Sequence, residues 1–160
     1  MGQSENNHLV DRVRKLFGGE PCRVQVAALP WRKADDGVEV MLITSRDTGR
    51  WVLPKGWPER AEPLWDAAAR EAMEEAGLSG AVAHREAGSY FYSKGVANGD
   101  DIPCEVLVYP LEVDRVADKW KERRERQRRW VRAGDAAAMV NEPDLAALIS
   151  AFAERPRGFA

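Results

Sequence analysis

Short runs of apolar and β-branched residues recur along the chain, bounded by clusters of glycine, proline and acidic residues. Such runs are typical of β-strands, and the turn-like segment KADDG between the first two predicts a hairpin. A last run, RRWV at 128–131, predicts one more strand after a long charged stretch. Together the runs predict a small mixed β-sheet. The other predicted strands are 22–31, 38–45, 51–54, 80–93 and 104–113.

Helical signals lie between and after these strands. Pro63 stands where the first turn of a helix tolerates proline, and Gly77 stands where a helix ends. These two residues predict a helix over Pro63–Ala76. Apolar periodicity predicts two closing helices at 135–140 and 143–154. The fold class is therefore α+β.

Length and composition limit the organisation and the partners. The 160 residues suit one domain, at 21–155, behind a polar, glycine-interrupted flexible arm at 1–20. The net charge of −2 gives no general attraction to nucleic acid or to an acidic membrane. No secretory signal or membrane-spanning run is present, and Cys22 and Cys104 lack metal-ligand spacing, which predicts a reducing cytoplasm.

The helix at Pro63–Ala76 has an unusual charge pattern. Glu71, Glu74 and Glu75 fall within one arc of roughly 100°, where like charges repel by a few tenths of a kcal/mol. A divalent cation would reverse this repulsion, and carboxylates suit Mg²⁺ or Mn²⁺ with a phosphate completing the coordination. A separate apolar arc is expected to pack, and consists of Trp65, Ala69, Ala72, Met73 and Ala76.

The same charges are also compatible with a solvated helix face on which Arg70 pairs with Glu74. The residues before the helix favour the metal site instead. Gly56 lies in a strand-to-helix loop, where backbone can approach a ligand closely. Glu62 follows near the start of the helix.

Read from Gly56 to Leu78, these residues resemble a complete Nudix box, the signature of the Nudix hydrolase superfamily. The motif consists of the glycine, five residues, Glu62, seven residues and then REAMEEAGL from Arg70. Seven fixed residue types match, which chance would produce on the order of once in a hundred thousand such chains. The resemblance implies that Arg70 and Glu62 form a supporting pair that fixes the loop to the helix.

The resemblance also implies the fold and the chemistry. It predicts a mixed β-sheet sandwiched between α-helices, and a magnesium- or manganese-dependent hydrolase of phosphoanhydride bonds in nucleoside-diphosphate-linked or polyphosphorylated small molecules. Glu71 and Glu75 would hold the metal, with the carbonyl of Gly56. Glu74 would orient or deprotonate the attacking water. Such chemistry is consistent with what metal ions do, since they neutralise a diphosphate and lower the pKa of bound water.

Outside the box, SRDTGRWVLPKGWPE and RRWV are similar to the diphosphoinositol polyphosphate phosphohydrolase branch, which also acts on diadenosine polyphosphates. Polyanionic substrates require a basic rim, because each phosphate needs charge-assisted donors. In this branch a basic residue beside the last tryptophan is usual, here Arg128 or Arg129. The candidate substrate-binding residues are Arg23, Arg46, Arg50 and Lys55.

The chain departs from that branch at two places. Lys55 stands where a glycine is usual, and DDIPCEV stands where basic residues are usual. The missing cations weaken the case for inositol pyrophosphates, and leave dinucleoside polyphosphates or another compact diphosphate open.

The basic segment 119–132 supports an alternative, a Nudix-like module that binds RNA or another polyanion. Glu122 and Glu125 dilute its charge, and no nucleic-acid-binding signature accompanies it. We therefore predict a charged loop and a small-molecule substrate rather than a nucleic acid. The sequence is compatible with a monomer or a homodimer.

Overall fold

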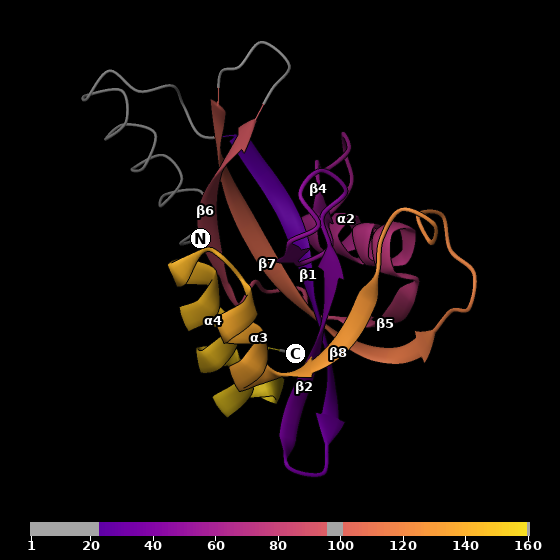
Figure 1. Ribbon diagram of the computed structural model, residues 1–160, viewed down its shortest axis with the longest axis vertical. Coiled ribbons are helices and arrows are strands. Elements are labelled where there is room, and N and C mark those ends of the chain that lie inside the picture. Colours follow the sequence, from indigo (N-terminus) through magenta and orange to yellow (C-terminus); the bar gives the residue numbers. More distant parts are fainter. Residues whose placement is uncertain (1–22, 96–100, 160) are drawn as a thin grey trace.

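The computed structural model describes residues 23–95 and 101–159. Within these ranges, eight strands form one mixed sheet in the order β3-β2-β1-β7-β5, while β4 also pairs with β1, β6 with β7 and β8 with β2 (Figure 1). The strands are β1 (Arg23–Ala34), β2 (Gly37–Thr44), β3 (Trp51–Val52), β4 (Lys55–Gly56), β5 (Leu78–Val82), β6 (Gly88–Gly95), β7 (Asp101–Val116) and β8 (Arg128–Arg132). The helical elements are α2 (Leu64–Glu71), the π-helical turn η1 (Ala72–Ala76), α3 (Ala133–Met139), α4 (Pro143–Glu154) and the 3₁₀ turn η2 (Pro156–Phe159).

Two long strands form the centre of this sheet. β1 pairs in parallel with β7 from Arg23 to Trp31 and antiparallel with β2 from Trp31 to Ala34. Successive side chains of a strand point to opposite faces. Val26 and Ala28 therefore enter one core, and Ala27 and Leu29 enter the other.

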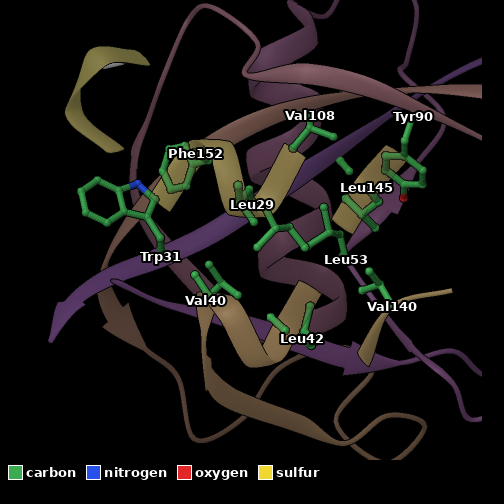
Figure 2. Packing of buried hydrophobic residues seen from close by; sticks show 14 of the residues in the cluster. Leu29, Trp31, Val40, Leu42, Leu53, Tyr90, Val108, Val140, Leu145 and Phe152 are labelled. Atoms are coloured by element: carbon green, nitrogen blue, oxygen red, sulfur yellow. The ribbon is translucent and has the colours of Figure 1, made fainter. Parts of the chain in front are cut away.

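Helices cover both faces of the sheet, as the resemblance to Nudix proteins predicted. On one face, α3 and α4 pack their apolar side chains against β1 and β2, as Figure 2 shows for Leu29, Leu42, Leu145 and Phe152. On the opposite face, α2 and η1 pack their alanines against the sheet. The mixed sheet sandwiched between helices is thus confirmed.

The packed face of α2 and η1 differs from the predicted apolar arc. Ala67 and Ala68 are fully buried, whereas Met73 is 40% exposed. Glu71 and Glu75 lie on the buried side and are only 8% and 7% exposed. The prediction assumed a regular α-helix, but the chain widens into a π turn over its last five residues. Small alanine side chains also let the helix lie close to the sheet, which draws the two carboxylates beneath the surface.

Other differences concern short or interrupted elements. The predicted strand at 80–93 is divided between β5 and β6, because the chain turns after Val82. β4 and η2 were not predicted, since elements this short carry no periodic signal. The arm predicted at 1–20 lies outside the described residues. Among those described, no helix combines the length and apolar character needed to cross a membrane.

Candidate active site

The short strand β4 brings Gly56 against the carboxylate of Glu71. β4 pairs with Val26 and Ala27 in the middle of β1, which fixes its position. A Cβ atom built on Gly56 would lie 2.5 Å from Oε1 and 2.7 Å from Oε2 of Glu71. Since any side chain would collide with that carboxylate, the close approach requires glycine here.

The carboxylate of Glu75 is held from two sides. Its Oε1 accepts a hydrogen bond from the backbone N–H of Lys55 at 3.1 Å, and its Oε2 lies 3.3 Å from Nη2 of Arg126. The Arg126 side chain is only 9% exposed. It also donates from Nε to Glu122 at 3.1 Å and from Nη1 to the carbonyl of Thr44 at 3.0 Å.

Burial makes both of these glutamates difficult to ionise. It raises the pKa of Glu71, against the opposing charge of Arg70. Burial also raises the pKa of Glu75 to about 7, with Arg126 as the largest opposing influence and Glu71 adding to the rise. The charge of Glu71 opposes the ionisation of Glu75, the charge of Glu74 opposes that of Glu71, and a bound cation would favour the charged forms.

Arg70 ties the loop after β4 to the helix. Its Nε and Nη2 donate to the two carboxylate oxygens of Glu62 at 3.1 and 3.0 Å. Nη2 also donates to the carbonyl of Trp57 at 3.2 Å, and Nη1 donates to Oε1 of Glu71 at 2.8 Å. Hydrogen bonding to Arg70 lowers the pKa of Glu62. The structure therefore brings Arg70 and Glu62 together, and the same guanidinium orients Glu71.

Glu74 differs from its two neighbours in facing solvent. Its side chain is 32% exposed, and its Oε2 lies 3.9 Å from both Nη1 of Arg70 and Nζ of Lys121. At that distance neither contact is a hydrogen bond, so the carboxylate is accessible to water or substrate. The alternative of a solvated acidic face is wrong for Glu71 and Glu75, which are buried.

Residues 117–128 cap the end of η1, a contact that the sequence did not reveal. The last carbonyls of a helix lack intrahelical partners, and this segment supplies donors for them. In Figure 1 it is the orange loop beside the helix labelled α2. The Arg128 guanidinium also lies 3.8 Å from the centre of the Trp120 ring. Arg128 was one of the two residues compared with the basic position of the diphosphoinositol polyphosphate phosphohydrolase branch. Here its guanidinium binds the end of the helix. The donor and acceptor pairs are Glu122 N to Glu74 O at 3.0 Å, Trp120 Nε1 to Glu75 O at 3.1 Å, Arg128 Nη1 to Ala76 O at 2.8 Å and Ala117 N to Gly77 O at 2.8 Å.

The four candidate substrate-binding cations come from three segments of the chain, β1, the connection between β2 and β3, and β4. Lys55 is the nearest to the buried acids, because its backbone binds Glu75 and its side chain lies over the ring of Tyr92 at 5.0 Å. Burial lowers the pKa of the Lys55 ammonium. Arg23 is exposed at the start of β1. Its charge and that of Lys55 each oppose the rise that burial causes in the pKa of the Cys104 thiol.

Arg50 and Arg46 lie in the connection between β2 and β3, and the charge of Arg50 adds to the lowering of the Lys55 pKa. Arg50 donates to Oε1 of Glu142, at the start of α4, at 3.0 Å. Arg46 lies 3.6 Å from Glu122, on the side of the molecule formed by residues 120–125. These residues and Arg46 line an open hollow of about 700 Å³.

Comparison with known proteins agrees with this geometry. The family model described as the NUDIX domain matches residues 22–152. The chain belongs to the Nudix family. The mitochondrial Nudix hydrolases 12 and 17 of Arabidopsis thaliana are each 34% identical to it, over 62% and 71% of this chain and 50% and 64% of their own lengths. Diphosphoinositol polyphosphate phosphohydrolase 2 of Rattus norvegicus is 27% identical over 79% of this chain and 67% of its own. The Nudix chain thus spans half to two-thirds of these relatives.

Solved structures show the same fold. The NUDIX domain of Shewanella oneidensis NrtR, complexed with ADP ribose, superposes with a TM-score of 0.63 at 19% identity, covering 98% of this Nudix chain and 99% of that one. A C. elegans Ap4A hydrolase binary complex superposes with a TM-score of 0.56 at 21% identity, covering 85% and 98%. At these identities the likeness establishes the Nudix fold.

Proposed function

We propose that this Nudix chain is a magnesium- or manganese-dependent hydrolase of phosphoanhydride bonds in nucleoside-diphosphate-linked or polyphosphorylated small molecules. The observation that carries the proposal is the pair of buried carboxylates, Glu71 and Glu75, beside the backbone of Gly56. Buried charges need compensation, and a divalent cation supplies it for two acids at once.

The residues at this site fit a hard divalent cation. The proposed ligands are Glu71, Glu75 and the carbonyl of Gly56. Within the described parts of the chain, no group of three or more His, Cys, Asp and Glu side chains is arranged to hold a metal. Mg²⁺ commonly binds through one or two carboxylates and completes its octahedron with water and substrate phosphates. Two carboxylates and a carbonyl therefore suffice for this class of ion.

The cation, Glu74 and Arg70 would each have a separate role in hydrolysis. When bound, a divalent cation would neutralise phosphate oxygens and increase the acidity of water. Glu74, partly exposed and only loosely paired, would orient the attacking water and accept its proton. Arg70 holds Glu62 and Glu71 in place. As the water oxygen bonds to phosphorus, the anhydride P–O bond breaks and its oxygen leaves with the other phosphate.

The substrate side of the proposal rests on Lys55, Arg50, Arg23 and Arg46 as phosphate-binding residues. Lys55 has the strongest support, since it lies beside Glu75. Similarity to the rat diphosphoinositol polyphosphate phosphohydrolase and to the C. elegans Ap4A hydrolase makes diphosphoinositol polyphosphates and diadenosine polyphosphates the two candidate substrates, and the missing cations in DDIPCEV weigh against the first.

A substrate panel tests the activity. Diadenosine polyphosphates, inositol pyrophosphates, nucleotide sugars and nucleoside triphosphates are each incubated with Mg²⁺, Mn²⁺ or EDTA, and the products are identified. We expect metal-dependent cleavage of at least one class, and a loss in kcat of about 10²–10⁴-fold in Glu74→Gln. The exposed Glu154→Gln on α4 serves as the matched control with unchanged kcat. Failure to cleave any class with either metal would contradict the proposal.

The alternative function has one observation in its favour. Lys121, Arg123 and Arg124 are exposed beside the hollow that Arg46 lines, and a polyanion such as RNA would contact them there. The interleaved glutamates reduce this positive charge. RNA affinity that falls steeply with salt would support a binding module, whereas metal-dependent release of phosphate supports the hydrolase.

The proposal includes the organisation of the protein. We expect one Nudix domain at 21–155, a cytoplasmic location, and a monomer or homodimer that binds no nucleic acid. Cell fractionation and light scattering of the purified chain test the location and the oligomeric state.

A further inference from the structure

We infer that Arg126 is a positioning residue for the proposed metal site, and that its guanidinium fixes the carboxylate of Glu75 in the orientation that the cation requires. The inference rests on the proposed function, because it takes Glu75 as a metal ligand. Arg126 lies outside the Nudix box, in the segment 117–128 that caps η1. The fold alone brings it to Glu75.

Three nitrogens of Arg126 each have a separate partner. Nη2 lies 3.3 Å from Oε2 of Glu75, Nε donates to Glu122 at 3.1 Å, and Nη1 donates to the carbonyl of Thr44 at 3.0 Å. These partners belong to the acidic helix, to the capping segment and to the end of β2. A planar guanidinium presents its donors in a fixed fork. It cannot turn toward solvent without losing all three partners, so Arg126 is a rigid support.

This support determines which parts of the Glu75 carboxylate remain available. Oε1 is held by the backbone N–H of Lys55 and Oε2 by Arg126. A carboxylate has about four lone-pair sites, so acceptor capacity remains on both oxygens for a cation. Because both ends of the carboxylate are already fixed, the ligand does not have to be ordered when the cation binds. Partners that orient metal ligands typically change affinity by about 10–100-fold.

The charge of Arg126 and the shape of its guanidinium can be separated. The positive charge repels an incoming cation, but it also favours the ionised form of Glu75 that a cation needs, so the charge alone has no fixed effect on metal affinity. A lysine at this position keeps the charge and lacks the planar fork. A change in Mn²⁺ affinity in Arg126→Lys therefore reports the geometry of the support.

The experiment titrates the full chain with Mn²⁺, followed by electron paramagnetic resonance, and measures kcat and KM in parallel. Arg126→Lys keeps the charge and loses the fork. We expect its Mn²⁺ Kd to rise about tenfold and its kcat to fall, with KM for substrate nearly unchanged. Arg115→Lys, an exposed arginine near the end of β7, is the matched control and should match wild type.

A second background separates positioning from a general structural role. In Glu75→Gln, the further change Arg126→Lys should cost no additional Mn²⁺ affinity, because the residue that Arg126 orients is already altered. Circular dichroism and thermal melts of every variant establish that the fold is retained.

The outcomes distinguish this inference from the proposed function. Wild-type Mn²⁺ affinity in Arg126→Lys, together with weakened affinity in Glu75→Gln, would overturn the positioning role and leave the metal site standing. Equal losses from Arg126→Lys in both backgrounds would also overturn it. Wild-type affinity in Glu75→Gln would refute the metal assignment itself, and the role of Arg126 with it.

Discussion

Replacing Glu75 by glutamine should change how the stability of the metal-free protein depends on pH. The pKa of Glu75 rises from 4.5 to about 7 in the folded protein, chiefly through burial. The folded state therefore favours the protonated acid. Its contribution to the free energy of unfolding is fully present below about pH 4.5, and is lost as the pH rises through 7. At neutral and higher pH the buried charge destabilises the fold.

The size of this effect follows from the two pKa values. A pKa raised from 4.5 to about 7 corresponds to roughly 3 kcal/mol, of which about 2–3 kcal/mol falls between pH 5 and 8. Glutamine also places an amide donor near Lys55 N–H or Arg126, which lowers stability by a constant amount. That offset cancels when stabilities at two pH values are compared. The slope with pH, rather than the absolute stability, is therefore the quantity to measure.

The assay is urea unfolding in EDTA at several pH values between 5 and 8, for wild type, Glu75→Gln and the exposed control Glu154→Gln. We expect wild type and the control to lose about 2–3 kcal/mol more stability across this range than Glu75→Gln does. Saturating Mg²⁺ should flatten the wild-type slope, because the cation compensates the ionised acid. Equal slopes for wild type and Glu75→Gln in EDTA would refute the reasoning.

Three further substitutions test the backbone around the site. Gly56→Ala should reduce kcat on the order of a hundredfold, because its Cβ would lie 2.5 Å from the carboxylate of Glu71 and displace it; activity within twofold of wild type would contradict the close approach. Gly77→Ala should lower the free energy of unfolding by about 2 kcal/mol, measured by urea unfolding, because Gly77 has a φ of 68° and its Cβ would lie 2.8 Å from the Trp120 ring. Ala61→Gly should raise the melting temperature by a few degrees in calorimetry, because Ala61 has a φ of 64° that costs an L-residue about 1 kcal/mol; a lower melting temperature would show that this conformation carries no strain.

The parts of the site that depend on local spacing could be predicted from the sequence. Gly56, Glu62 and the glutamates belong to one continuous motif, so a strand-to-helix connection suffices to place them near each other. The α+β class was also predictable, because strand and helix periodicities are properties of short windows, whereas the layering of helices on both faces was implied by the resemblance to Nudix proteins.

Contacts between distant segments could not be predicted in the same way. Arg126 reaches Glu75 only because residues 117–128 follow a path of turns against η1, and turns of this kind have no periodicity to read. The burial of Glu71 was missed for a related reason. The packed face of α2 is lined with alanines. Because alanine is small and only weakly hydrophobic, a hydrophobic pattern does not identify this face as the buried one.

The capping segment, residues 117–128, has one set of groups that holds it to η1 and another set that faces outward. Its attachments to η1 use main-chain groups together with Trp120 and Arg128, while the side chains at 119, 121, 123 and 124 point outward and are exposed. Substitutions at those four positions can therefore change the charge and shape of the surface next to Glu74, while the contacts that hold the segment to η1 are retained.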